Sequence, residues 1–241
     1  MEKGKKNLLF PWSPDSIRWY KTATEYCGYH RHLSDLLTWQ LPKDARVCDM
    51  GCGIGSLALE LAPHCSHVTA VDIDAIALES LRSECSARHI ENIEITEGDF
   101  ELLSPPEKPF DAIIFCLFGN LPHYYARARQ WATGKIFFIV NASSNPKFSI
   151  ADNARYRSDE KDCREFLDSV GAVYRQERVS LDFGQPLTDI EEALKFVRYY
   201  NPDASDKELK AHLEKYLRVA FGGYAFFLPS QKDLSIFSID I

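Results

Sequence analysis

The sequence lacks long hydrophobic runs, paired cysteine motifs and clear linkers. No apolar stretch approaches the ~20 residues that a membrane-spanning helix needs, and apolar runs such as residues 136–140 and 224–228 are short. The basic start, MEKGKKNLLFPW, is not followed by the apolar core of a signal peptide. We therefore expect a cytoplasmic protein that does not associate with a membrane.

The seven cysteines show no CxxC spacing. Cys48 and Cys52 are separated by three residues, and the other five are scattered along the chain. This pattern predicts neither a disulfide framework nor a zinc site. We expect reduced thiols that act as small buried apolar groups, and no bound metal.

Positive charge is in short supply. Lysine and arginine number 28 against 35 aspartates and glutamates, which gives a net charge of −7. This balance argues against a protein whose main task is to neutralise nucleic-acid phosphates, so no nucleic-acid partner is expected. Hydrophobic residues make up 45% of the 241 residues, enough for a real core in one large α/β domain.

An aromatic-rich helical region is expected from Ser13 to Gln40, with a break near Gly28. Ser13 suits the N-cap of a helix, and Pro14 suits the first helical position. From residue 45 short strands alternate with helices, which predicts βαβ units and a mostly parallel sheet. The predicted strands cover residues 46–50, 67–72, 93–96, 110–116 and 135–141, and the predicted helices cover residues 56–62, 75–89, 122–131 and 159–169.

The last third of the chain has a different pattern. A strand at 178–183 is followed by two amphipathic helices at 189–200 and 205–219. Segments 224–228 and 234–239 flank a turn and predict an antiparallel hairpin that completes the sheet. We expect a single domain over residues 1–241, divided into a helical lid (1–42), a cofactor-binding core (43–184), a helical cap (185–221) and the closing hairpin (222–241).

A glycine-rich loop follows the first strand directly. Gly51 and Gly53 allow a sharp turn and a close approach of a ligand to the backbone. Cys52 lies between them, and the helix that opens at Ser56 leaves backbone N–H groups free for polar parts of the ligand. Asp49 precedes the loop, where a carboxylate can bind a cationic amine. The loop therefore predicts a cofactor site.

Acidic residues end the next two strands. Asp72 comes about twenty residues after the glycines, where a carboxylate can accept hydrogen bonds from both ribose hydroxyls. Ile73 can pack on one face of an adenine ring. Asp99 can accept from an exocyclic amine, with the ring of Phe100 as an apolar wall. Open α/β sheets bind ligands at the carboxyl ends of neighbouring strands, so we expect these residues to share one crevice.

Two alternatives accompany this interpretation. A lone glycine turn occurs without any ligand, and an aspartate after a strand is often a helix cap, as Asp74 is expected to be. A dinucleotide site is the nearest rival, because Asp72 suits NAD equally well and the glycine spacing nearly fits. Asp49 disfavours a pyrophosphate at the loop, and Asp99 adds a second contact to the nucleoside. We therefore favour a methyl donor, with an NAD-dependent oxidoreductase as the alternative.

With these motifs, the chain resembles the class I, Rossmann-like S-adenosylmethionine-dependent methyltransferases, strongly over about residues 45–141 and weakly over the closing strands. The resemblance implies S-adenosyl-L-methionine as cofactor, bound by residues 51–55, Asp72 and Asp99. It also implies a seven-stranded sheet with an antiparallel last strand. The fourth strand, which ends at Cys116, resembles the strand that faces the methyl group. The [ND]PP[YF] turn of enzymes that methylate base or glutamine amines is replaced by Leu117-Phe118-Gly119-Asn120.

The methyl acceptor is expected to be a small molecule, methylated on oxygen or nitrogen by in-line transfer. The helical lid and cap lie where family members cover the cofactor. The aromatic residues there that we expect to bind the substrate are Tyr20, Tyr26, Tyr29, Tyr199 and Tyr200. His30 and His123 are candidates for a general base. For each of these residues the alternative is a structural role in the core or on the surface.

Two further hypotheses concern assembly and activity. We expect a monomer or a homodimer. A methyltransferase fold that has lost activity and serves as a binding module is a third functional class, although the intact glycine loop, Asp72 and Asp99 argue against lost cofactor binding.

Overall fold

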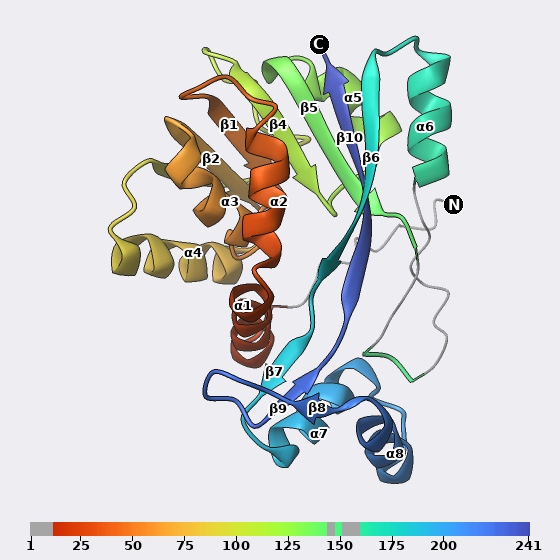
Figure 1. Cartoon of the computed structure of the whole chain (residues 1–241). Coiled ribbons are helices and arrows are strands. Elements are labelled where there is room, and N and C mark those ends of the chain that lie inside the picture. The colour runs from red at the N-terminus through yellow and green to blue at the C-terminus, as the bar shows by residue number, and fades with distance from the viewer. Residues whose placement is uncertain (1–11, 144–147, 151–159) are drawn as a thin grey trace, which may run out of the picture.

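A seven-stranded sheet forms the centre of the protein, with helices on both faces (Figure 1). The structure is a computed structural model that describes residues 12–143, 148–150 and 160–241. The strand order is β3-β2-β1-β4-β5-β10-β6. The strands are β1 (Arg46–Met50), β2 (His67–Asp72), β3 (Ile93–Glu97), β4 (Phe110–Cys116), β5 (Ala132–Asn141), β6 (Tyr174–Asp182) and β10 (Gln231–Asp240).

The direction of the strands agrees with the family resemblance. Strands β1 to β5 pair in parallel. Strand β10 runs antiparallel between β5 and β6, with Ile236 opposite Ile139 on one side and Glu177 on the other. The predicted seven-stranded α/β sheet with an antiparallel last strand is therefore confirmed, and it brings the carboxyl ends of β1, β2, β3 and β4 to one edge.

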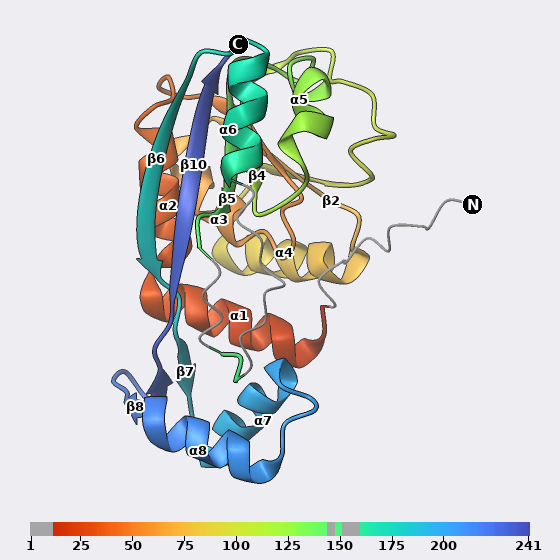
Figure 2. The ribbon, with the colours of Figure 1, turned by 90° about the vertical axis from the view of Figure 1, so that its right-hand side faces the viewer.

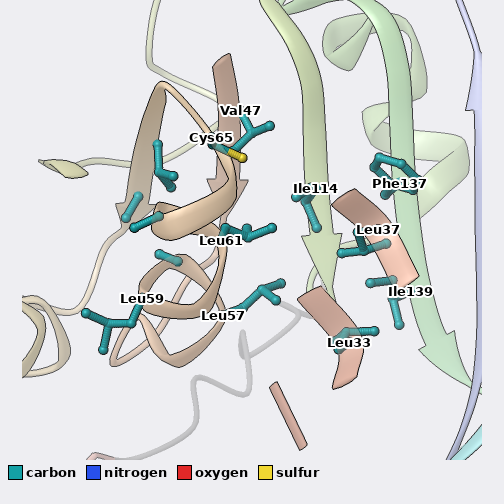
Figure 3. Close-up of a cluster of buried hydrophobic side chains, with 14 of the residues drawn as sticks. Leu33, Leu37, Val47, Leu57, Leu59, Leu61, Cys65, Ile114, Phe137 and Ile139 are labelled. Carbon is teal, nitrogen blue, oxygen red and sulfur yellow. The ribbon is translucent and has the colours of Figure 1, made fainter. Parts of the chain in front are cut away.

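Helices α2 (Tyr29–Thr38), α3 (Ser56–Leu61) and α4 (Ala75–Arg88) contribute to the core on one face of the sheet, and α5 (Leu121–Ala128) and α6 (Glu160–Ser169) to the core on the other. Figure 3 shows Leu33 and Leu37 of α2 next to Ile114, Phe137 and Ile139 of the sheet. All five side chains are completely buried. Burial of such side chains contributes roughly 1.5–3 kcal/mol each.

Helix α1 (Pro14–Cys27) begins and ends as the sequence predicts. The Ser13 hydroxyl accepts a hydrogen bond from Ser16 N, and Ser13 N donates one to the Ser16 hydroxyl, so both backbone N–H groups have a partner. Gly28 ends the helix with φ 64°, a conformation that costs glycine little. Figures 1 and 2 show α1 beneath the carboxyl edge of the sheet.

A second, smaller unit lies on the other side of α1 (Figure 2). It contains a three-stranded sheet of order β7-β9-β8 and two helices. The elements are β7 (Gln185–Leu187), α7 (Ile190–Tyr200), α8 (Asp206–Tyr216), β8 (Arg218–Val219) and β9 (Phe226–Leu228). Trp19 of α1 is 3% exposed and belongs to the core of this unit, together with Phe196 and Leu213. Helix α1 therefore joins the two units.

The predicted closing hairpin is wrong. Strand β9 pairs with β7 and β8, whereas β10 pairs with β5 and β6. The pairing of β6 with β10 and the pairing of β7 with β9 share one register: Asp182 lies opposite Gln231, and Gln185 lies opposite Leu228. Between these pairs, Phe183 N donates a hydrogen bond to Ser230 O at 2.8 Å. The segment 226–240 is thus nearly one long strand that bends at Pro229, where the missing N–H interrupts the ladder.

Among the described residues, no helix is both long and apolar enough to cross a bilayer.

Candidate active site

The glycine loop is held against β2 by three short hydrogen bonds. The N–H groups of Gly51 and Cys52 donate to Val71 O at 2.8 and 3.0 Å, and Gly53 N donates to Asp72 Oδ2 at 2.7 Å. Asp74 N donates to the other Asp72 oxygen at 2.9 Å. Gly51 and Gly53 have φ of 74° and 55°, a region that costs other residues about 1–2 kcal/mol. The predicted loop therefore forms, and it fixes the Asp72 carboxylate.

Asp49 is buried directly behind this loop. Its side chain is 1% exposed, and its Oδ2 atom has no hydrogen-bond partner among the described residues. Burial raises the pKa of Asp49 to about 7, the nearby Asp72 adds to the rise, and a backbone hydrogen bond from Ala58 opposes it. A buried carboxyl without a counter-charge is costly. The site therefore fits the cationic amine of a ligand.

The two other acids lie at the same edge of the sheet. Strands β1, β2 and β3 are neighbours, and Gly98 N donates to Asp72 O at 2.9 Å, which ties the end of β3 to β2. Asp99 is exposed and accepts from Glu101 N at 2.9 Å. Ile73 is 42% exposed beside Asp72, so its side chain is free to pack on a ligand. Asp74 caps α4, as its structural interpretation predicts.

Phe100 lies in the core instead of at the ligand edge. Its ring is 2% exposed and packs against the rings of Phe115, Tyr124 and Trp131, with Arg127 over its face. The predicted contact with adenine therefore has no support, because the ring offers almost no free surface. Aromatic residues after a strand are equally suited to closing the core, and the sequence pattern does not separate the two roles.

Two aromatic rings that the sequence analysis missed cover the glycine loop. A Cβ atom added to Gly51 would lie 2.2 Å from the Phe118 ring, and one added to Gly53 would lie 3.0 Å from the Trp12 ring. Leu117, just before Phe118, has φ 55°, which is unusual for a side chain of its size. The position of Phe118 just after β4 could have indicated that its ring lies at the ligand edge. For Trp12 the sequence offered only its position before the helix cap.

A second group of side chains, here called the lysine cluster, lies past the end of β4. Its members are Tyr20, Tyr29, Cys116, Phe183 and Lys232. The Lys232 ammonium lies 3.9 Å from the ring centroid of Phe183, 5.0 Å from that of Tyr29 and 5.6 Å from that of Tyr20. Part of the lysine side chain is exposed, yet burial lowers its pKa to about 8, while Cys116 opposes the fall. Lys232 therefore remains mostly charged at pH 7.

The other titratable groups of the cluster stay neutral. Burial raises the pKa of Cys116 to about 12, helped by Asp49 and opposed by Lys232. Burial also raises the pKa of Tyr20 and of Tyr29, and the proximity of Cys116 adds to both. Tyr29 is fully buried and its hydroxyl has no partner among the described residues. Tyr20 and Tyr29, two of the residues predicted to bind the substrate, thus lie near Cys116, the residue predicted to face the methyl group.

His30 lies beside this cluster as a neutral, bonded ring. Its Nε2 is 3.3 Å from the Tyr20 hydroxyl, and its Nδ1 is bonded to the Thr24 hydroxyl. Burial lowers the pKa of His30 well below its usual value, and the charge of Lys232 lowers it further. Both ring nitrogens are therefore engaged, so the structure offers no support for a free general base at this position.

Three predicted residues lie away from the cluster. His123 is exposed on α5 and its Nε2 is 2.9 Å from Glu101. Tyr26 packs on Tyr224 and Phe227 of the small unit. Tyr199, which is 36% exposed, packs on Trp19 and Tyr200. Their predicted catalytic and substrate roles have no support in these positions, whereas Tyr200 is close enough to Tyr20 to add to the rise of its pKa.

In the part of the chain that the structure describes, no group of three or more His, Cys, Asp or Glu is placed to hold a metal ion. Cys52 lies in the glycine loop, and burial raises its pKa well above the usual value, so it stays a neutral thiol.

Comparison with known proteins identifies related sequences over part of the chain. The chain is 35% identical over 108 residues to a ribosomal protein L11 methyltransferase of Phocaeicola vulgatus, covering 41% of this chain and 38% of that protein. It is also 35% identical over 77 residues to an rRNA adenine N-6-methyltransferase of Streptomyces fradiae, covering 32% of this chain and 23% of that protein. The chain thus spans less than two fifths of the length of either relative.

These relatives contradict two expectations. The sequence predicted a small-molecule acceptor and no nucleic-acid partner, whereas the two relatives are named for a ribosomal protein and for rRNA. Net charge misled the prediction because it averages the whole surface. Helices over a cofactor are equally compatible with a large acceptor that contacts them from outside.

The fold and the donor motifs agree with these sequence matches. The YcgJ protein of Bacillus subtilis superposes with a TM-score of 0.58 at 16% identity, over 87% of this chain and 98% of that structure. Residues 47–136, from the buried strand β1 through the glycine loop, Asp72 and Asp99 into β5, match the model of a methyltransferase domain. The described residues therefore have the Rossmann-like α/β methyltransferase fold, and residues 47–136 are similar to S-adenosylmethionine-dependent methyltransferases of class I.

Proposed function

We propose that this protein transfers a methyl group from S-adenosyl-L-methionine to a protein acceptor. The observation that carries the donor assignment is Asp49, a buried carboxyl with an unpartnered oxygen directly behind the glycine loop. A cationic amine at this point would restore the missing counter-charge. An NAD pyrophosphate, in contrast, would bring negative charge next to Asp49 and Asp72.

Each donor residue has a separate task in this proposal. Asp49 binds the amine of the methionine part, Asp72 binds the ribose hydroxyls and Asp99 binds the adenine amine. The loop from Gly51 to Gly55 brings the backbone close to the ligand. The bound cofactor supplies an electrophilic methyl group on a sulfonium. The protein then has to orient the acceptor in line with that methyl group and to exclude water.

A protein acceptor is favoured over RNA by the charges around α1. Three cations on this side are already paired: Arg18 with Glu192, Lys21 with Glu84 at 2.7 Å and Lys195 with Asp15 at 2.6 Å. RNA binding usually relies on unpaired lysine and arginine that contact phosphates. The relative named for ribosomal protein L11 supports a protein acceptor as well.

Donor binding and acceptor class can be tested separately. Saturating S-adenosylhomocysteine, the demethylated cofactor, should raise the melting temperature by about 5–10 °C, because ligand at 100 times its Kd adds about 2.7 kcal/mol. A shift with NAD alone would refute the donor assignment. Donor with a labelled methyl group, incubated with a cell extract, should label material that protease removes. Material removed by ribonuclease would indicate RNA, and cofactor binding without any labelling would indicate an inactive binding module.

A further inference from the structure

Lys232 lies on the same face of the sheet as Asp49 and Cys116. Side chains alternate between the two faces along a strand. Each of the three residues is two positions from an apolar residue on its own strand and therefore points to the same face as that residue. These apolar neighbours all belong to one core cluster: Val47, Ile114 and Leu234. Strand β10 is the third strand from β1, and the register places Asp49 level with Ser238, six residues from Lys232 along β10. Cys116, on the strand next to β1, is close enough to both Asp49 and Lys232 for each of them to shift its pKa. The amine-binding acid and the lysine therefore lie on opposite sides of Cys116.

The Lys232 ammonium is a cation that lacks a carboxylate. Within the described residues its contacts are the faces of three aromatic rings, and no hydrogen bond or ion pair joins it to an acid. Aromatic faces attract a cation, but they do not accept its three hydrogen bonds as an anion does. The fully buried Tyr29 hydroxyl, whose ring faces the lysine, is also unpartnered in the described part of the chain. An incoming oxygen anion would supply the hydrogen-bond acceptor that the Lys232 ammonium lacks.

The chemistry of methyl transfer favours one class of acceptor group in the protein substrate. A sulfonium donor bound near Cys116 carries a positive charge, so Lys232 and the donor would repel a third cation between them. A protein amine is protonated at neutral pH and has to lose a proton before it can attack. His30 has both ring nitrogens engaged, and Tyr20 and Cys116 are neutral groups that hold their protons. A carboxylate acceptor is attracted by both cations and needs no base.

We propose that the acceptor group is a carboxylate of a protein substrate, held by Lys232, and that the product is a methyl ester. This inference rests on the proposed function. One carboxylate oxygen forms a bond to the methyl carbon, the carbon–sulfur bond breaks and its electron pair stays on sulfur. The carboxylate charge and the sulfonium charge cancel, and no proton moves. The Lys232 ammonium donates a hydrogen bond to the oxygen that does not attack, which orients the other oxygen toward the methyl group.

The ester is tested by its lability to base. One pool of synthetic peptides carries Asp, Glu and a free C-terminal carboxylate; a matched pool carries Asn, Gln and a C-terminal amide, and both contain lysine. With a donor carrying a labelled methyl group, we expect label only in the acidic pool, released as volatile methanol by mild alkali. Base-stable label, or equal label in both pools, would overturn the carboxylate while leaving a protein acceptor intact. If RNA is labelled and neither peptide pool is, the proposed function itself is refuted.

Variants of Lys232 test its role directly. Lys232→Met should raise the KM of the acidic peptides at least about tenfold, because the variant loses a hydrogen bond to a charged group. Lys232→Arg should retain more of this affinity because it keeps the cation. Lys210→Met on the exposed face of α8 is the matched control and should change nothing. Equal loss of S-adenosylhomocysteine affinity in Lys232→Met would overturn the proposal, since the lysine would then hold the carboxylate of the cofactor.

Discussion

The donor side and the acceptor side of the carboxyl edge bury opposite charges in different ways. On the donor side, Asp49, Asp72 and Asp99 end three neighbouring strands within about fifty residues of chain. On the acceptor side, Lys232 lies among rings from α1, α2 and the turn after β6. Burial raises the pKa of Asp49 to about 7 and lowers that of Lys232 to about 8. Each side therefore holds a charge that its own surroundings do not compensate.

The difference teaches how the two sides are assembled. The donor side depends on backbone conformation, because its glycine turn and its strand ends are local features. The acceptor side depends on helix α1, which packs Ala23 into the main core and Trp19 into the core of the small unit. Donor binding should therefore survive changes in the small unit that weaken acceptor binding, and the predictions below test this separation.

The largest effect is expected from Asp49→Asn. Loss of the carboxylate should weaken S-adenosylhomocysteine binding by about 100-fold, the value of a buried charged hydrogen bond of about 3 kcal/mol. Wild-type affinity should rise about tenfold from pH 6 to pH 8, because the carboxylate ionises with a pKa of about 7. The variant should lose this pH dependence. Isothermal titration at several pH values measures both.

The stability of the ligand-free protein should change in the opposite direction. The folded-state pKa of Asp49 lies above its usual value of 3.8, so the folded state binds the proton more tightly. Stability from this group is present below pH 3.8 and is lost as pH rises toward 7, by at most about 4 kcal/mol. Asp49→Asn should therefore be more stable than the wild type at pH 8 in urea unfolding. Equal or lower stability would contradict a buried, uncompensated carboxylate.

The next largest effect is expected from Gly51→Ala, compared with Gly171→Ala. Both glycines have positive φ, at 74° and 62°, so each substitution costs about 1–2 kcal/mol in the backbone. Only at Gly51 would the new Cβ meet a ring, that of Phe118 at 2.2 Å, while Gly171 has open space around it. Gly51→Ala should lose cofactor binding and more unfolding free energy. Similar losses in both variants would show that φ alone matters.

A smaller effect should separate the acceptor side from the donor side. Glu192 of α7 accepts hydrogen bonds from Arg18 and Trp19 of α1 and from Thr188 N. Burial alone would raise its pKa, but the bonds from Thr188 and Arg18 hold it at about 2. Glu192→Gln should cost about 1–3 kcal/mol of unfolding free energy at pH 7, and it should slow methylation more than it weakens cofactor binding.

The control for this variant is Glu191→Gln, which changes an exposed neighbour on the same helix. The sign of the pH dependence is a second check. The folded-state pKa of Glu192 is depressed, so its stabilisation is present above pH 4.5 and is lost as pH falls toward 2. The stability difference between wild type and Glu192→Gln should shrink over this range. A constant difference would assign the effect to packing.

The smallest effect is expected from His123→Ala. The ring is exposed, and its ion pair with the exposed Glu101 is worth about 0–1 kcal/mol. The variant should keep the cofactor affinity, the methylation rate and the melting temperature within experimental error. A clear loss of rate would restore His123 as a catalytic candidate and would place the acceptor over α5.

Much of the donor side could be predicted from the sequence. Glycines after a buried strand predicted the loop, and the periodicity of short apolar runs predicted β1 to β5 closely. Phe100 was misplaced because an aromatic ring after a strand can face the ligand or the core. The closing hairpin was misplaced because Pro229 and Ser230 resemble a turn, whereas the structure uses them to bend one long strand.

The lysine cluster left only a faint trace in the sequence. Lys232 is in phase with the buried Leu234 and Ile236, which marks it as an inward-facing lysine, but nothing local names its partners. Tyr20, Tyr29 and Phe183 come from positions 49 to 212 residues away. Their convergence depends on the order of the strands and on the docking of α1.

The sequence by itself determined the glycine loop and the acids at the strand ends, because positive φ at glycine and residues that follow a strand are properties of short segments. The same is true of the helix that Ser13 and Pro14 begin. Only the tertiary structure decided that β10 enters between β5 and β6, that α1 joins two cores and that Lys232 meets three aromatic rings without an acid. These features arise from packing between distant segments, where burial of apolar surface outweighs local preference.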